Sequence, residues 1–366
     1  MQQPIYLDYN ATAPIFPSVM EKMQEVMKEA HNPSSIHRLG RNAKHLLEQA
    51  RCFIAEEVSC FPAELIFTSS GTEAINLALR GLPQDMPKAY CATEHAAVIN
   101  TLPGAHQLAV DVSGIVNMDA LENYMRKNSG ACVAVMLANN ETGVIQPIKD
   151  IADIVHAYDG VLFCDAVQAL GKINIDVNLL NADMMSMCAH KMGGPQGAGA
   201  LYISQKLETK AQITGGGQEL GRRAGTENVA ALCGFAEAIK HNRTLQWQSH
   251  VRDWLDIMES QCSDYFSDQS IVIGSEAPRL PNTSAIHLPG LSSETQLMKA
   301  DLAGFCISAG SACSSGRMAQ SHVIDAMTQE PQNVIRVSAG WHTTQSDIES
   351  FSAFWLKMAK KAKHIY

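Results

Sequence analysis

The sequence predicts an α/β protein whose larger part is a mostly parallel β-sheet with helices on both faces. From about residue 60 to residue 205, short apolar runs of strand length alternate with amphipathic segments of helix length. Parallel strands need crossover helices between them, and strands buried on both faces consist of nearly continuous apolar residues. The length of 366 residues also allows one large and one smaller domain.

The hydrophobic pattern places the elements of the large sheet in chain order. Apolar runs predict strands at residues 65–68, 88–92, 132–138, 161–164, 184–188 and 200–203. Amphipathic repeats between these runs predict helices at residues 73–80, 119–127 and 148–158. Strands and helices therefore alternate as a mostly parallel sheet requires.

A smaller α/β domain is expected towards the C-terminus. Residues 226–262 have a helical pattern and lead into strand-like runs at 270–273, 284–288 and 334–338. We expect the N-terminal segment to join this part of the chain. The large domain would then comprise residues 15–250, and the small domain residues 1–14 together with 251–366.

Composition excludes several classes of protein. The 46% of hydrophobic and 18% of charged residues are typical of a globular protein rather than a disordered one. The formal net charge of −9 argues against a broad nucleic-acid-binding face. The first residues have neither a basic nor an apolar signal region, and the longest apolar run, 131–138, is too short to cross a membrane. We therefore expect a cytoplasmic protein.

Ten cysteines raise the question of disulfides or a metal site. None of them forms a CxxC pair, which disfavours a structural metal or iron–sulfur centre. Most lie in apolar runs, as Cys164 does, and are interpreted as small buried hydrophobic residues in a reducing compartment. Cys313 is the exception.

Short polar clusters follow five of the expected strands. Ligands of parallel α/β sheets bind beyond the carboxyl ends of the strands, so these clusters are expected to converge on one crevice. The clusters are Ser69-Ser-Gly-Thr72, Glu94-His95, Asn139-Asn-Glu141, Asp165 and His190-Lys191.

Lys191 and Asp165 are candidates for a cofactor site. Lys191 follows an apolar strand and precedes a glycine-rich stretch, a setting that would suit a lysine forming a Schiff base. Asp165 ends an apolar strand, where a carboxylate could face the ring nitrogen of pyridoxal phosphate (PLP). Taken alone, Lys191 also fits a surface lysine at the start of a loop, and Asp165 fits a cap of the following turn.

Two further clusters would suit the same cofactor. Thr68-Ser-Ser-Gly-Thr72 precedes a predicted helix, whose exposed N–H groups would bind a phosphate, although a plain helix cap is the alternative. His95 could stack on a flat ring or move a proton, and a structural histidine is the alternative. Asn140 and Gln168 could hydrogen-bond to ring substituents.

The C-terminal part holds a candidate nucleophile and a candidate substrate-binding arginine. Cys313 lies among small residues and glycines, in Ser308-Ala-Gly-Ser-Ala-Cys-Ser-Ser-Gly316, which suits an accessible thiolate but also an ordinary loop cysteine. Arg336 interrupts an apolar run, where it would bind a substrate carboxylate bidentately or form a structural salt bridge.

Taken together, these residues resemble the cysteine desulfurases of the class V aminotransferase family, PLP enzymes of fold type I. The resemblance runs through nearly the whole chain. It begins at Leu7-Asp-Tyr-Asn-Ala-Thr-Ala-Pro14, continues through Asn32-Pro-Ser-Ser-Ile-His37 and the clusters above, and ends at Arg336-Val-Ser-Ala-Gly340. The occurrence of all these motifs in the same order is highly specific.

The resemblance implies a role for each candidate residue. Lys191 would bind PLP covalently, Asp165 would pair with its ring nitrogen, and His95 would stack on the ring and shuttle protons. Arg336 would hold the substrate carboxylate. The phosphate would be bound by Gly71, Thr72, Cys188, His190 and the partner subunit's Thr226. The ring would be contacted by Asn140 and Gln168.

The resemblance also implies the reaction and its partners. L-Cysteine would be converted to L-alanine, and the sulfur would remain as a persulfide on Cys313, carried by a long mobile loop of the small domain. Relatives of this kind pass sulfur to iron–sulfur scaffold proteins or tRNA-thiolation proteins. A homodimer is implied because Thr226 would act in the neighbouring subunit's site.

Two positions depart from the family pattern, and other functions stay open. Cys188 stands where the family usually has a phosphate-binding serine, and a thiol is a poorer hydrogen-bond donor. Trp341 stands where close relatives carry an arginine. The alternatives are a selenocysteine lyase or aminotransferase of the same superfamily, or a catalytically idle platform for sulfur transfer.

Overall fold

The computed structural model describes residues 3–29, 31–244, 246–266, 271–310, 320–327 and 331–363. The strands are β1 (Ile5–Tyr6), β2 (Leu65–Thr68), β3 (Lys88–Cys91), β4 (His106–Leu108), β5 (Cys132–Met136), β6 (Val161–Asp165), β7 (Met184–Cys188), β8 (Gly199–Ile203), β9 (Thr283–His287), β10 (Phe305–Cys306) and β11 (Val334–Ser338). The helices are α1 (Pro17–Lys28), α2 (Arg38–Glu57), α3 (Gly71–Gly81), α4 (Ala96–Ile99), α5 (Met118–Lys127), α6 (Ile148–Ala157), α7 (Val177–Leu180), α8 (Val229–Thr244), α9 (Trp247–Phe266), α10 (Ser293–Leu302), α11 (His322–Met327) and α12 (Gln345–Lys363).

The largest sheet has seven strands in the order β2-β8-β7-β6-β5-β3-β4. Neighbouring strands from β7 to β4 are parallel, whereas β8 runs antiparallel to both of its neighbours, β7 and β2. Consequently β2, β3, β5, β6 and β7 all end at the same edge of the sheet. The predicted α/β class with a mostly parallel sheet is confirmed.

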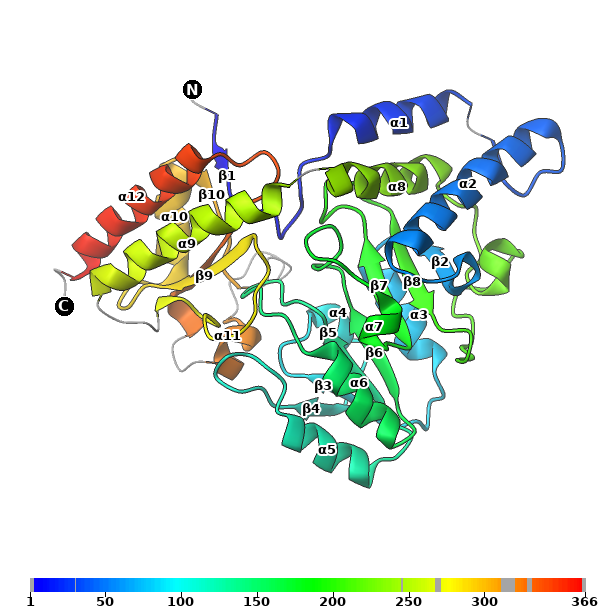
Figure 1. The fold of residues 1–366 in the computed structure, drawn as a ribbon, viewed down its shortest axis with the longest axis horizontal. Helices are drawn as coiled ribbons and strands as arrows, with labels where there is room; N and C mark the ends of the chain where they lie inside the picture. Colours follow the sequence, from blue (N-terminus) through cyan, green and yellow to red (C-terminus); the bar gives the residue numbers. More distant parts are fainter. Residues whose placement is uncertain are drawn as a thin grey trace.

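Helices cover both faces of this sheet because alternate strand residues point to opposite sides. In β5, Val133 and Val135 contribute to the core shared with α1, α2, α5, α6 and α8, whereas Cys132 and Ala134 contribute to the core shared with α3 and α4. Figure 1 shows the strands between these two sets of helices. Burial on both faces explains why the strand sequences are almost continuously apolar.

The structure refines the predicted elements. The predicted helical segment 226–262 is divided into α8 and α9, and the predicted strand at 270–273 forms only a bridge between Val272 and Ile286 in its described part. The edge strand β4 was not predicted, because two of its three side chains are exposed and show no apolar run.

A second hydrophobic core lies beside the first and contains β9, β11, α9 and α12 (Figure 1). Strands β9 and β11 are antiparallel, and β1 pairs with β10, so the N-terminal segment does contact this part. Helix α8 packs on α1 and α2, whereas α9 packs on α12. On this packing we propose the two domains expected above, with the boundary close to the start of α9.

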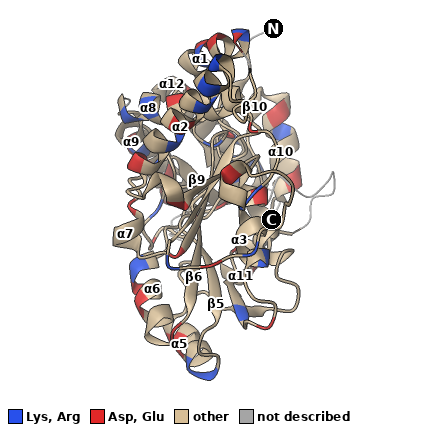
Figure 2. Ribbon diagram, turned by 90° about the vertical axis from the view of Figure 1, so that its right-hand side faces the viewer, with Lys and Arg blue, Asp and Glu red and all other residues tan. Residues whose placement is uncertain are grey.

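Charged side chains lie mainly on the outer helices. On the face shown in Figure 2, Lys and Arg alternate with Asp and Glu along helices such as α5, α6 and α10, while the central strands carry few charges. No helix in the described ranges combines the length and apolarity needed to cross a membrane. Of the cysteines that the structure describes, all are unpaired and most are buried, with Cys52 exposed.

A buried ion pair fixes the segment that follows the last strand of the large sheet. Arg51 of α2 donates two hydrogen bonds of 2.7 Å to the carboxylate of Glu219, which also accepts a 2.7 Å bond from the backbone N–H of Phe67. Glu219 and Leu220 both adopt positive φ angles, of 48° and 58°. Such angles are strained for these residue types, so the ion pair must stabilise the conformation.

We predict that Glu219→Gln lowers the free energy of unfolding by about 3–5 kcal/mol, because Arg51 would keep a buried charge without its main counter-charge. Urea unfolding of this variant measures the loss. Glu208→Gln, which neutralises an exposed glutamate, is the matched control and should change stability by no more than about 0.5 kcal/mol. Equal stability of the two variants would contradict the assigned role of the ion pair.

Candidate active site

The carboxyl ends of five strands meet at one pocket of about 240 Å³. Each of the five polar clusters that were expected to converge contributes at least one residue to its lining, whereas the cluster members Ser69, Glu94, Asn139 and Glu141 do not line it. The lining residues are Asn10, Ala11, Ser70, Gly71, Thr72, Ile75, His95, Met136, Ala138, Asn140, Asp165, Val167, Gln168, Cys188, His190, Lys191 and Arg336. The predicted crevice beyond the strand ends is therefore present.

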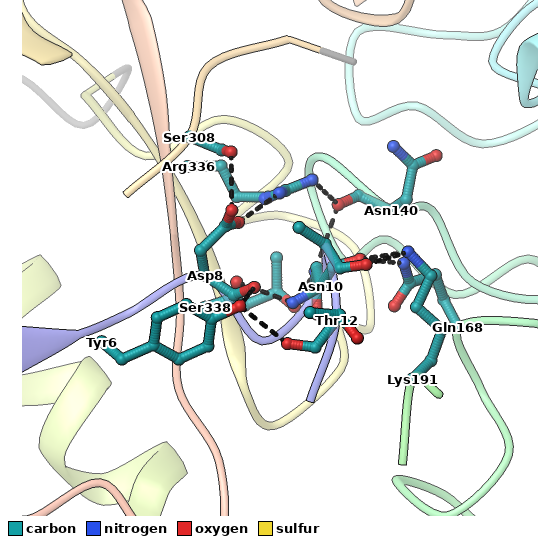
Figure 3. Close-up of polar contacts among 12 residues, drawn as sticks. Tyr6, Asp8, Asn10, Thr12, Asn140, Gln168, Lys191, Ser308, Arg336 and Ser338 are labelled. Carbon is teal, nitrogen blue, oxygen red and sulfur yellow. Dashed lines mark hydrogen bonds and ion pairs between the residues drawn. The ribbon is translucent and has the colours of Figure 1, made fainter. Parts of the chain in front are cut away.

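Lys191 follows β7 and points towards the N-terminal segment. Its Nζ donates hydrogen bonds of 2.7 Å to the carbonyl oxygens of Asn10 and Ala11, as Figure 3 shows for Asn10. These acceptors orient the amine at the wall of the pocket. Lys191 is not the surface lysine that was the alternative interpretation.

Asp165, the last residue of β6, is 5% exposed and lines the same pocket. Its Oδ1 accepts a 2.7 Å bond from the Ser186 hydroxyl and a 3.0 Å bond from the N–H of Val167. The carboxylate therefore caps the following turn and also lines the pocket, and its pairing with a cofactor stays a prediction. Ser186, on the adjacent strand β7, fixes its orientation.

His95 lies at the N-terminus of α4, directly after β3. Its Nδ1 accepts a 3.1 Å bond from the N–H of Ala97, which leaves the proton of the neutral ring on Nε2. Burial, with the nearby charges of Lys191 and His322, lowers the pKa of His95, although Asp165 opposes this effect. The ring that results is neutral and has a proton to donate at Nε2.

The first turn of α3 faces the pocket with its free N–H groups. Ser70 caps the helix by accepting a 3.1 Å bond from the N–H of Glu73. A side chain at Gly71 would lie 2.6 Å from Val167, so glycine permits the close approach of this turn to the segment after β6. Such a helix start is suited to binding a phosphate group.

Cys188 and His190 complete this side of the pocket. Burial raises the pKa of the Cys188 thiol to about 11, so the residue remains an uncharged thiol. Burial and the neighbouring lysines lower the pKa of His190 to about 4, so its ring is neutral. Both can therefore contribute neutral hydrogen bonds rather than charges.

Arg336, in the centre of β11, reaches the pocket from the smaller core. One of its terminal nitrogens is 2.6 Å from the carboxylate of Asp8, and the other donates a 2.9 Å bond to the carbonyl of Asn140 (Figure 3). Its buried Nε has no hydrogen-bond partner among the described residues. The side chain forms the salt bridge foreseen from sequence and still has donor capacity towards the pocket.

Gln168 is held by hydrogen bonds within the pocket wall. Its amide nitrogen donates a 2.9 Å bond to the carbonyl of Asn10, and its oxygen accepts a 2.7 Å bond from Lys172. Asn140 lines the pocket, and its backbone carbonyl also accepts a 3.1 Å bond from the Asn10 side chain. Asn10 is thus a common partner of both residues.

Two buried glutamates lie behind the pocket. Glu94 is fully buried and accepts a 2.6 Å bond from the N–H of Met136. Burial and the proximity of Asp165 raise its pKa well above the usual value, which favours the protonated form of this carboxyl group. Burial likewise raises the pKa of Glu141, which accepts a 2.5 Å bond from Ser321.

Of the predicted site residues that the structure describes, Thr226 is not brought into the pocket of this chain. Thr226 lines a separate cavity of about 70 Å³ with Ser69 and Arg223. Cys313 lies outside the described residues. Earlier in the chain, the hydroxyl of Ser308 donates a 3.0 Å bond to Asp8. Later in the chain, Nε2 of His322 is 2.8 Å from the Glu94 carbonyl oxygen.

A larger cavity of about 610 Å³ lies between α2 and residues 217–220. It is lined by Arg51 and Glu219 but by none of the residues predicted for catalysis, so we place the active site in the smaller pocket. Trp341, the second departure from the family pattern, packs on Phe16 and donates a 3.1 Å bond to the Pro14 carbonyl.

Sequence reasoning overlooked Asp8, Asn10, Lys172 and Ser186 as parts of the site. Asp8 and Asn10 are polar residues within the Leu7–Pro14 motif, which was a detectable signal. Lys172 follows Gln168 by one helical repeat, and Ser186 interrupts an otherwise apolar strand. Within the described ranges, no group of three or more His, Cys, Asp or Glu side chains could hold a metal ion.

Comparisons with known proteins agree with this geometry. The family model for class-V aminotransferases matches residues 5–351. "Cysteine desulfurase IscS" of Dictyoglomus turgidum is 35% identical over 370 residues, covering 95% of this chain and 92% of the relative. A NifS-like protein from Rickettsia africae has a similar structure, with a TM-score of 0.89 and 32% identity over 98% of this chain and 100% of the other.

A third comparison concerns a structure with a bound amino acid. The structure described as "SspA in complex with cysteine" matches with a TM-score of 0.79 and 28% identity, over 91% of this chain and 98% of the other. The family model spans nearly the whole chain, including every site residue described above. The chain therefore belongs to the class-V aminotransferase family.

Proposed function

We propose that the protein is a PLP-dependent cysteine desulfurase that converts L-cysteine to L-alanine and holds the sulfur as a persulfide on Cys313. The observation that carries this proposal is the meeting of Lys191, Asp165, His95 and Arg336 at one pocket. The relatives named cysteine desulfurases and the related structure with cysteine support the same substrate.

The residues of the pocket fit PLP. A buried carboxylate, Asp165, a lysine amine, Lys191, and the helix start at Gly71 and Thr72 line the same cavity. These groups match the ring nitrogen, the aldehyde and the phosphate of the cofactor respectively. Asn140 and Gln168 line the wall beside them, and Cys188 and His190 lie near the proposed phosphate position.

PLP supplies an electron sink for the bond changes at the α-carbon of an amino acid. Asp165 would keep the ring nitrogen protonated, and its orientation is fixed by Ser186 and the N–H of Val167. Lys191 would hold the cofactor covalently and release it to the incoming amino group. The imidazole of His95 would deliver the proton that its neutral form carries on Nε2 and take it back at the same atom.

Arg336 would bind the substrate carboxylate. Its guanidinium is buried, and a carboxylate is the group that its remaining N–H donors bind best. Asp8 already neutralises one edge of the guanidinium, so a substrate would be held by the donors directed to the pocket.

The sulfur step requires the thiolate of Cys313. It would form an S–S bond to the substrate sulfur as the C–S bond breaks, and the electron pair of that bond would pass to the substrate carbon. A proton delivered to this carbon then gives alanine, and the enzyme is left as Cys–S–SH. Ser308 and His322, which flank the Cys313 segment, both contact residues around the pocket, which supports this assignment.

The acceptor of the sulfur belongs to the same proposal. We propose transfer to the thiol of a partner protein, either an iron–sulfur scaffold protein or a tRNA-thiolation protein, in the cytoplasm. No direct contact with nucleic acid is proposed, because charges of both signs alternate on the outer helices (Figure 2).

We predict that the purified protein turns over L-cysteine to alanine and sulfide in the presence of a reductant. Lys191→Ala should abolish the covalent link to PLP and reduce turnover by at least about 1000-fold, because no amine would hold the cofactor. Cys313→Ser should bind PLP normally but form no persulfide, which mass spectrometry without reductant measures. Pyruvate or a new amino acid as the product would instead favour a different class-V reaction.

We predict that Cys188→Ser binds PLP about two- to threefold more tightly, because a hydroxyl donates a stronger hydrogen bond to phosphate than an uncharged thiol. The dissociation constant of PLP from the reconstituted protein measures the effect. Cys164→Ser serves as a control for a buried cysteine outside the pocket lining. An unchanged dissociation constant in Cys188→Ser would exclude a phosphate contact at this position.

We predict a homodimer in which Thr226 binds the phosphate of the neighbouring subunit, since its own cavity is separate from the active-site pocket. Sedimentation should give a mass near twice 39.7 kDa. Mixed dimers of Lys191→Ala and Thr226→Ala should contain one intact site and recover PLP binding. A fully active monomer would refute the shared site.

A further inference from the structure

Lys172 is a buried lysine with no acidic partner. It is 5% exposed, and its Nζ donates hydrogen bonds of 2.8 Å to the Asn10 side-chain oxygen and 2.7 Å to the Gln168 side-chain oxygen. None of the ion pairs among the described residues includes it. An amine in this position is costly to bury, which calls for a specific reason for its presence.

The charges around Lys172 do not stabilise an ammonium group. Its pKa is lowered well below the usual value by burial and then by the positive charges of Lys191 and Arg336, with only Cys188 acting in the opposite direction. A lysine on the surface of the same protein can instead have an acidic partner. Lys149, for example, forms an ion pair with Asp153 on α6.

The two acceptors of Lys172 lead directly to Lys191. Gln168 donates a 2.9 Å bond to the Asn10 carbonyl oxygen, which is the oxygen that also accepts a 2.7 Å bond from Lys191. Figure 3 shows Gln168 and Lys191 pointing to this carbonyl from the same side. Lys172 does not line the pocket itself, and the hydrogen bonds of Asn10 and Gln168 join it to Lys191.

An amine at this position determines how both amide groups are turned. Lys172 donates its hydrogen bonds, so the oxygen of the Gln168 amide must face it. The nitrogen of the same amide then faces the Asn10 carbonyl. The Asn10 oxygen faces Lys172 and Asn282, which leaves its nitrogen for the Thr283 hydroxyl and the Asn140 carbonyl. Without the amine, a reversed Gln168 amide would place two oxygens against each other.

We propose that Lys172 is a positioning residue for Lys191: it fixes the amides of Asn10 and Gln168 and so holds the carbonyl group that orients the Lys191 amine for attachment of PLP. This inference rests on the proposed function. It assigns to Lys172 a role in cofactor attachment rather than in contact with substrate.

The test compares Lys172→Met with Lys149→Met in the full-length protein after removal and re-addition of PLP. Methionine keeps most of the apolar stem and removes the donor, which leaves two buried oxygens short of a partner. We expect Lys172→Met to bind PLP about tenfold more weakly and to form the covalent link more slowly. Lys149→Met should stay within about twofold of the unmodified protein, since its ion pair is exposed.

A double-mutant cycle with Asn10→Ala separates positioning from a general loss of packing. If Lys172 acts through the Asn10 side chain, its substitution should cost at least about threefold less PLP affinity in the Asn10→Ala background than alone. Thermal unfolding of the cofactor-free variants, followed in parallel, shows whether they remain folded. Should Lys172→Met fail to fold, Lys172→Gln takes its place in the same cycle with the same expected direction.

Two results would overturn the inference. One is PLP binding within about twofold of the unmodified protein when Lys172 is replaced. The other is full independence of the Lys172 and Asn10 substitutions in the cycle. Failure of the unmodified protein to bind PLP at Lys191 would instead refute the proposed function, so the two failures are distinguishable.

Discussion

The hydrogen bonds of Asn10 connect the two halves of the molecule, and the active site depends on them. From the smaller core, the hydroxyls of Ser338 and Thr283 and the amide of Asn282 contact this residue. From the large sheet, Lys191, Gln168 and Lys172 contact it. Asn10 is 1% exposed, so nearly every polar group of the residue must find a partner within the protein. The position of the Lys191 amine therefore depends on the packing of both cores.

The architecture of the large sheet could be predicted from the sequence because its strands are buried on both faces. Such strands are short continuous apolar runs, and β2 and β7 have the residue limits that the pattern predicts. The pairing of β1 with β10 could not be predicted, since two-residue strands carry no period. The division between α8 and α9 could not be predicted either, because the helical patterns of the two segments adjoin.

The candidate site was predictable where residues follow strands and not where they depend on tertiary contacts. Lys191, Asp165, His95 and Asn140 each come shortly after a strand of one parallel set, so the topology alone brings them together. Asn10 and Lys172 meet only when distant segments fold against each other, which no local pattern indicates. The role proposed for Thr226 requires a second subunit, which no local pattern of the sequence describes.

Strand β11 links two functions of the smaller core through its backbone. The N–H of Arg336 donates a 2.6 Å bond to the Ser308 carbonyl, and its own carbonyl accepts a 3.2 Å bond from the Ser308 N–H, while Asp8 joins both side chains. Sliding of this strand would displace the guanidinium and the root of the thiol-bearing segment by a common amount. With the roles proposed for Arg336 and Cys313, recognition of the substrate carboxylate and delivery of the sulfur nucleophile would then shift together, because Arg336 and Ser308 are paired through their backbones.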